Sequence, residues 1–217
     1  ALVASSCQAS FDNNKDINVY NREWGSGTRE AFFASSGVNF AAAGANSAAS
    51  DDVIVDGASS QTSNGNMINA VKNDIYGIGY ISLSTLENSG LKGLSFQGVE
   101  ATEANTVTGD YSLQRPFNYI TRENWDYDAT NGAAKQAIIE ALVMYMYANE
   151  GRAIIAQNGG ILTGSSTGAF VRPNICTTNN SHITLRVGGS TSVDKMAQAL
   201  TANFKGLCGN VEFAHAA

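Results

Sequence analysis

The chain has 217 residues, of which 43% are hydrophobic and 15% are charged, and its net charge is −6. This composition is typical of a folded globular protein and argues against intrinsic disorder. The charge is spread thinly and no run of lysine or arginine stands out, so we expect no nucleic-acid partner. The apolar stretches are shorter than the roughly 20 residues that cross a bilayer, so we expect no transmembrane segment in this chain.

The first third of the chain predicts a strand, a helix and a loop-rich stretch. A strand is expected over residues 16–20, followed by a helix through 29–33 with Ser26 as its N-cap. Residues 34–62 are rich in glycine, alanine and serine, with one strand candidate at 53–55.

The middle of the chain continues the alternation. Ser63-Asn64-Gly65 caps a second helix, which places Met67, Ile68 and Val71 on one side. Residues 76–83 predict a buried strand whose glycines lie where another element packs closely. The stretch 91–112 is polar and turn-rich, with a strand expected near 94–96.

The last hundred residues repeat the pattern, which predicts an α/β architecture. Strands are expected at 117–121, 183–187 and 211–213, and helices at 133–147, at 152–157 and from 193 to Lys205-Gly206. Three cysteines, Cys7, Cys176 and Cys208, are compatible with one disulfide and a free thiol or with three buried thiols. A charged, apolar leader is not seen before Cys7, so we do not expect it to carry a lipid.

Two turns share one design, and both suggest anion binding. Gly25-Ser26-Gly27-Thr28 and Gly189-Ser190-Thr191-Ser192 each follow a predicted strand and open a predicted helix with small, hydroxyl-bearing residues. The first N–H groups of a helix lack internal partners and favour negative charge, so such a turn can cradle an anion. Arg22, four residues before Ser26, could hold an oxyanion with two parallel hydrogen bonds. Taken singly, each turn is better explained as an ordinary helix cap, since capping by serine and threonine is common; two such turns with an arginine weaken that explanation.

Other chemistry is poorly supported. His182 and His215 are far apart and have no partners at ligand spacing, which favours surface roles over a metal site. The sequence contains no dinucleotide fingerprint, no Walker motif and no Gly-x-Ser-x-Gly elbow that would make Ser26 a nucleophile. We therefore expect a binding protein without catalytic residues or cofactor.

The segment from Arg22 to Phe32 resembles the signature of the phosphate-binding proteins of ABC transporters. The likeness continues through 63–65, 76–83, 111–116 and the helices that end near 151 and 159, and it covers roughly residues 13 to 165 in the order of that family's second half. Residues 183–213 resemble the family's beginning. A cut from a tandem array, a permutation and a divergent tail all explain this order, and we favour a fragment or tandem origin.

The resemblance implies a periplasmic-binding-protein-like fold of type II, with two lobes that carry mixed sheets flanked by helices. The two lobes of this fold close on the anion. The chain need not contain the whole fold. The lobes are expected at 13–115 and 116–217. The resemblance further implies an extracellular, periplasmic or surface-anchored protein that passes inorganic phosphate to an ABC permease. The implied phosphate ligands are Arg22, Ser26, Gly27, Thr28, Thr191 and Ser192, while Arg29 either adds a contact or faces solvent.

Two departures from the family pattern stand out. Trp24 occupies the position of an acidic residue that usually braces the arginine, and Glu23 is the candidate substitute. The carboxylate that would accept the proton of phosphate, and so distinguish it from sulfate, cannot be located in this chain. The alternatives to phosphate capture are therefore a surface sensor, adhesin or structural module that binds another oxyanion or none.

Overall fold

The computed structural model describes residues 1–5, 12, 14–37 and 54–216. These residues form two compact units, Ala1–Pro116 and Phe117–Ala217, which we describe separately. Cys7 and Val53, to which the sequence expectations refer, lie outside the described residues. Within the described part of the chain, no helix is both long enough and apolar enough to cross a membrane.

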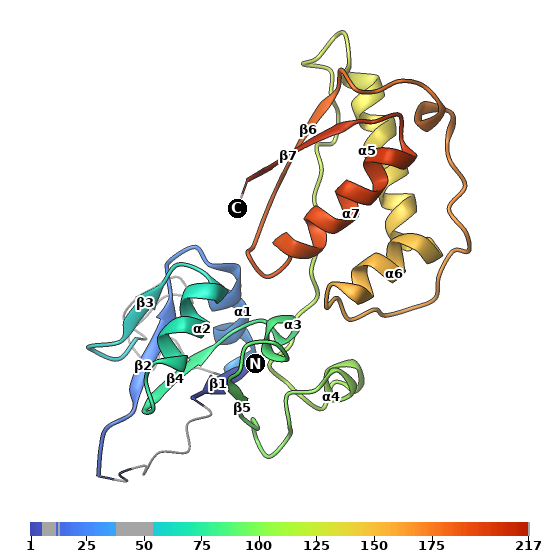
Figure 1. Cartoon of the computed structure of the whole chain (residues 1–217). Helices are drawn as coiled ribbons and strands as arrows, with labels where there is room; N and C mark the ends of the chain where they lie inside the picture. The colour runs from blue at the N-terminus through green and yellow to red at the C-terminus, as the bar shows by residue number, and fades with distance from the viewer. Residues whose placement is uncertain (6–11, 13, 38–53, 217) are drawn as a thin grey trace. The chain divides into compact units, whose positions relative to one another are not determined.

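The first unit is built on a five-stranded mixed sheet with the order β3-β2-β4-β1-β5 (Figure 1). Its strands are β1 (Leu2–Ala4), β2 (Asn18–Arg22), β3 (Ser59–Gln61), β4 (Gly77–Tyr80) and β5 (Lys92–Gly93). Strand β2 runs parallel to both β3 and β4, whereas β1 is antiparallel to β4 and to β5. The three parallel strands therefore end at the same edge of the sheet.

The helices of this unit are α1 (Gly27–Ser36), α2 (Asn64–Lys72), α3 (Leu83–Leu86) and α4 (Glu103–Thr108). Strand β4 places α1 and α2 on opposite faces of the sheet, because successive strand residues point in opposite directions. A Cβ added to Gly79 would lie 2.5 Å from Met67 Sδ of α2. The next residue, Tyr80, stacks on Phe32 of α1 with ring centroids 4.3 Å apart. The result is a helix–sheet–helix arrangement around β4.

The sequence predictions for this unit hold for the main helices and fail in the short elements. Ser26 and Ser63 cap α1 and α2, as expected, and Met67 and Val71 are fully buried. The strand expected at 53–55 is wrong for the described residues 54 and 55, since the strand lies at β3 instead. Strand β1 and helix α4 were not predicted, and the strand near 94–96 reduces to β5 and one bridge between Phe96 and Val99.

The described residues of the second unit, 117–216, form three α-helices, one short 3-10 helix and two strands. Its elements are α5 (Gly132–Tyr147), α6 (Asn149–Gln157), η2 (Asn174–Thr177), β6 (Thr184–Gly188), α7 (Asp194–Leu207) and β7 (Glu212–Ala216). Strands β6 and β7 are parallel and in register from Thr184 with Glu212 to Gly188 with Ala216, and α7 connects them. Hence the sheet of this unit is parallel, not mixed.

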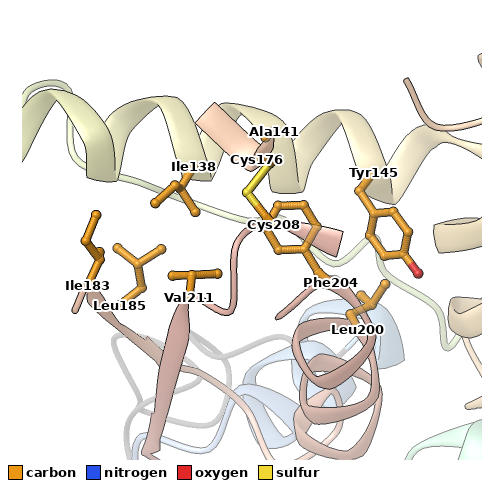
Figure 2. Close-up of a cluster of buried hydrophobic side chains, with 10 residues drawn as sticks. All are labelled: Ile138, Ala141, Tyr145, Cys176, Ile183, Leu185, Leu200, Phe204, Cys208 and Val211. Atoms are coloured by element: carbon orange, nitrogen blue, oxygen red, sulfur yellow. A yellow bond between two sulfur atoms is a disulfide. The ribbon is translucent and has the colours of Figure 1, made fainter. Parts of the chain in front are cut away.

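The core of the second unit gathers buried side chains from α5, η2, β6 and α7 and from residues next to the strands, while Ile154 and Ile155 of α6 and Phe213 of β7 pack against it (Figure 2). Its ten buried members are Ile138, Ala141, Tyr145, Cys176, Ile183, Leu185, Leu200, Phe204, Cys208 and Val211. A disulfide joins Cys176 of η2 to Cys208 at the end of α7, and both residues are fully buried. Of the two alternatives that the sequence left open, one disulfide or three buried thiols, the structure supports the disulfide.

Two features at the start of this unit differ from expectation or were not foreseen. Residues 117–121 form no strand, and Ile120 is 96% exposed. Trp125 lies in a cluster of cations and aromatic rings, with the Arg122 guanidinium 5.8 Å and Lys135 Nζ 6.0 Å from its ring centroid. Lys135 also pairs with Asp128 at 2.6 Å. These side-chain contacts lie between residues 122 and 135, outside the expected strand.

Candidate anion-binding site

One edge of the first unit's sheet collects the polar residues that the sequence singled out. Arg22 ends β2 and is in register with Gln61, which ends β3, while Tyr80 ends β4. Helices α1 and α2 begin within a few residues of this edge. Because the carboxyl ends of parallel strands and the amino ends of the following helices meet at one edge, this is where such sheets bind ligands.

Arg22 is the buried centre of this edge, with only 2% of its surface exposed. Its Nε donates to the Gln61 carbonyl oxygen at 3.0 Å, and its Nη1 donates to Asn64 Oδ1 at 3.1 Å. The backbone N–H of Arg22 donates to the Tyr80 hydroxyl at 3.0 Å, and that hydroxyl donates to Asn21 Oδ1. Strands β2, β3 and β4 and helix α2 therefore all fix the position of this arginine.

Glu23 braces the guanidinium in the way left open by the sequence. Arg22 Nε lies 2.9 Å from Glu23 Oε2, and Arg22 Nη2 lies 2.9 Å from Glu23 Oε1. Burial raises the pKa of the Glu23 carboxyl, but the hydrogen bonds and positive charge of Arg22 outweigh this effect and hold the pKa below its ordinary value. Trp24, at the position where an acid was expected, is 71% exposed.

The turn from Gly25 to Thr28 starts α1 as predicted. Gly25 has a φ of +82°, a conformation that glycine adopts without steric cost. Ser26 then caps the helix, its Oγ accepting from the Arg29 N–H at 3.4 Å. Ser26 and Thr28 are buried, at 6% and 9% exposure, so the start of α1 lies inside the fold.

Arg29 is a second buried cation. The expectation that it faces solvent is therefore wrong. Only 2% of its surface is exposed, its Nη1 donates to the Arg22 carbonyl oxygen at 3.3 Å, and its guanidinium lies 5.8 Å from the Phe33 ring centroid. Arg22 and Arg29 thus place two positive charges near one carboxylate, Glu23. The excess charge and the α1 dipole both favour an anion at this edge.

The turn at 189–192 in the second unit differs from its expected geometry. Helix α7 begins at Asp194 with Val193 as N-cap, and no side chain caps it. The Ser192 N–H donates to Ser190 Oγ at 3.3 Å, and the Val193 N–H donates to the Ser190 carbonyl at 3.0 Å. The alternative that this turn is an ordinary side-chain cap of α7 is therefore wrong, because a local turn uses the Ser190 groups instead.

The structure places the six predicted ligands in two different units. Arg22, Ser26, Gly27 and Thr28 come together at the sheet edge of the first unit, whereas Thr191 and Ser192 lie in the second. A carboxylate, Asp194, occupies the first turn of α7 and accepts from Gln198 Nε2 at 2.9 Å. The first unit therefore carries the stronger anion-binding geometry.

Two further residues contact Arg22 and were not singled out as site residues by the sequence. Asn64 is the first residue of α2 and contacts Arg22, and Tyr80 anchors the Arg22 backbone. Burial raises the pKa of Tyr80 to about 12, so it stays protonated at neutral pH. The motifs around them, 63–65 and 76–83, were visible in the sequence, but the side chains that reach Arg22 were not.

The histidines do not form a metal site in the described part of the chain, where no group of three or more metal-ligating side chains gathers. Both are exposed, and the ring Nε2 of His215 lies 2.8 Å from Thr201 Oγ1. This contact is compatible with the expected surface role.

Comparison with curated proteins finds relatives of one kind. Phosphate-binding protein PstS 2 of Streptococcus agalactiae is 32% identical over 160 residues, which are 74% of this chain and 50% of the relative. Phosphate-binding protein PstS 2 of Streptococcus pneumoniae is 29% identical over 193 residues, which are 87% of this chain and 58% of the relative. The chain thus spans about half the length of the curated relatives it matches. No family model matches it.

Solved structures give the same result. The phosphate-binding protein of a phosphate ABC transporter from Streptococcus pneumoniae matches 93% of this chain and 70% of its own, with a TM-score of 0.64 and 28% identity. A phosphate ABC transporter substrate-binding protein from Clostridium perfringens, solved with bound phosphate, matches 70% of this chain and 54% of its own, with a TM-score of 0.53 and 26% identity. The α/β fold expected from the sequence is therefore confirmed.

Proposed function

We propose that the chain captures inorganic phosphate and passes it to a membrane permease, because its sequence and fold are similar to those of phosphate-binding proteins of ABC transporters. It acts as a binding module and not as an enzyme. The observation that carries this proposal is the buried Arg22, braced by Glu23 and adjacent to the capped start of α1.

The proposed ligands in the first unit have distinct roles. Arg22 supplies a guanidinium fork, which matches the geometry of a phosphate oxygen pair. Ser26 and Thr28 supply hydroxyls, and Gly27 lets the anion approach the backbone N–H groups at the start of α1. In the second unit, Thr191 and Ser192 are proposed as further hydroxyl donors to phosphate.

We place the protein outside the cytoplasm, in the periplasm, in the medium or anchored at the cell surface. The support for this is the buried Cys176–Cys208 disulfide, since such bonds persist mainly in oxidising compartments. A phosphate collector for a membrane permease works on that side of the membrane.

Calorimetric titration of the chain with inorganic phosphate tests the proposal. We expect heat of binding with phosphate, weak competition by sulfate, and a loss of affinity of about a hundredfold or more for Arg22→Ala, because a charged, desolvated contact is removed. Arg186→Ala is the matched control, as Arg186 is exposed on β6. Unchanged affinity in Arg22→Ala, with a melting temperature close to that of the wild type, would remove Arg22 from the site.

One observation favours a different oxyanion as the second candidate. Both carboxylate oxygens of Glu23 accept from Arg22, so this carboxylate is engaged by the guanidinium, and no other carboxylate accompanies it in the described hydrogen bonds of Arg22. A site without such an acceptor would bind sulfate or a similar unprotonated oxyanion at least as well. Thermal shifts with phosphate, sulfate, molybdate and tungstate separate the two, and a sensor or structural role would show no shift with any of them.

A further inference from the structure

A buried amide connects Arg22 to the start of the next helix along the sheet edge. Asn64, the first residue of α2, is 5% exposed, and its side chain lies between Arg22 and Ser82. Its Oδ1 accepts from Arg22 Nη1 at 3.1 Å, and its Nδ2 donates to Ser82 Oγ at 3.3 Å. Ser82 lies two residues after the end of the neighbouring parallel strand β4.

The chemistry of the guanidinium fixes the direction of both bonds. Arginine has N–H donors and no acceptor, so only the oxygen of the Asn64 amide can face it. The NH2 group of the same amide must then face Ser82 Oγ. Rotation of the amide would place two donors against each other in a buried site, which costs the full desolvation of an unpaired polar group. Asn64 therefore has one orientation.

We propose that Asn64 is a positioning residue of the anion site: its amide holds the Arg22 guanidinium in the orientation in which it meets the anion. Glu23 and the Gln61 carbonyl hold Nε and Nη2, and Asn64 holds Nη1, so the plane of the guanidinium is fixed from both of its ends. The role in anion binding rests on the proposed function, whereas the positioning of Arg22 does not.

Asparagine suits this position better than aspartate for an electrostatic reason. A carboxylate could also accept from Arg22 Nη1, but it would add a second negative charge beside Glu23 and repel an arriving anion. It would also lack the NH2 group that donates to Ser82. The neutral amide orients the cation without neutralising it.

Three variants test the proposal. Asn64→Ala removes the orienting contact, and we expect phosphate affinity to fall about tenfold or more, in line with the cost of losing a hydrogen bond to a charged group. Asn64→Asp keeps the acceptor, so we expect the ligand-free melting temperature to be retained while phosphate affinity still falls. Asn66→Ala is the control, since Asn66 lies exposed in the same helix and contacts Thr62 Oγ1 instead.

A second readout requires no ligand. The NMR signals of the Arg22 guanidinium report its rotation, and we expect faster rotation in Asn64→Ala than in the wild type or in Asn66→Ala. Unchanged signals in Asn64→Ala would overturn the inference, as would Asn64→Asp binding phosphate as tightly as the wild type. Failure of the wild type to bind phosphate would overturn the proposed function instead and would leave the NMR comparison decisive for positioning.

Discussion

Replacing Cys176 and Cys208 with alanine measures how far the second unit depends on their disulfide. The bond links positions 32 residues apart and joins η2 to the end of α7 inside the core. Opening it lets the unfolded chain explore conformations that the cross-link forbids. The variant therefore destabilises the unit chiefly by raising the entropy of the unfolded state.

The length of the closed loop sets the expected size of the effect. For this separation the chain-entropy relation gives a loss of about 4 kcal/mol at 25 °C. For a unit of about 100 residues, that loss corresponds to a fall in melting temperature of roughly 15 to 30 °C. Because both cysteines are fully buried, the space left by the missing sulfurs adds to the loss.

Differential scanning calorimetry of the full chain is the assay. We expect the transition of the second unit to move to lower temperature in the double variant, and a reductant to have the same effect on the wild type. Thiol titration of the unfolded, unreduced protein counts the free cysteines directly. We expect one thiol per chain, because the Cys176–Cys208 bond uses two of the three cysteines. A shift below about 5 °C, equivalent to roughly 1 kcal/mol, would refute the reasoning.

Two further predictions concern β4. Gly79→Ala forces a Cβ against Met67 in a fully buried contact, and we expect urea unfolding to show a loss of about 1–3 kcal/mol. The control Gly206→Ala lies in α7 with open space at its Cβ and should instead add about 0.5–1 kcal/mol; equal effects would contradict the packing argument. Burial raises the pKa of Tyr80 to about 12. An unfolded tyrosine titrates near pH ~10, so the stability held by this proton is complete below that value and disappears as the pH rises through the folded pKa. Tyr80→Phe should remove this alkaline loss, and an unchanged slope of unfolding free energy between about pH 10 and 12 would disprove it.

The sequence predicts those elements of the fold that local signals determine. Ser26 and Ser63 are hydroxyl caps followed by helical patterns, and both helices begin where these residues indicate. The buried strand near Gly79 is correct because glycine marks the close approach of α2. Such features depend on a few neighbouring residues, and their physics is contained in a short stretch of chain.

The failures arise where tertiary partners decide. Residues 117–121 carry an aromatic, strand-like pattern, but a strand requires a neighbour to accept its backbone hydrogen bonds, and the pattern cannot supply one. At 189–192, the Ser190 side chain and carbonyl close a local turn, which moves the cap to Val193. The likeness of residues 183–213 to the beginning of the family stays a prediction, as do the tandem and permuted explanations.

The candidate site was predicted in outline from Arg22 and the turn at 25–28. Its internal connections were not, because Asn64 is 42 residues and Tyr80 58 residues from Arg22 in sequence. The brace is an exception, since Glu23 directly follows Arg22 and was named as a candidate from the sequence.

The placement of Trp24 and Trp125 gives each unit its own optical reporter. They are the chain's two tryptophans, one in each unit. Trp24 is largely exposed beside the Ser26 turn, whereas Trp125 lies against the cations Arg122 and Lys135. Single-tryptophan variants would therefore emit from different surroundings. In Trp24→Phe, only Trp125 emits, so its fluorescence would report on the second unit without an attached dye. In Trp125→Phe, only Trp24 emits, and its fluorescence would report on the surroundings of the anion-binding turn.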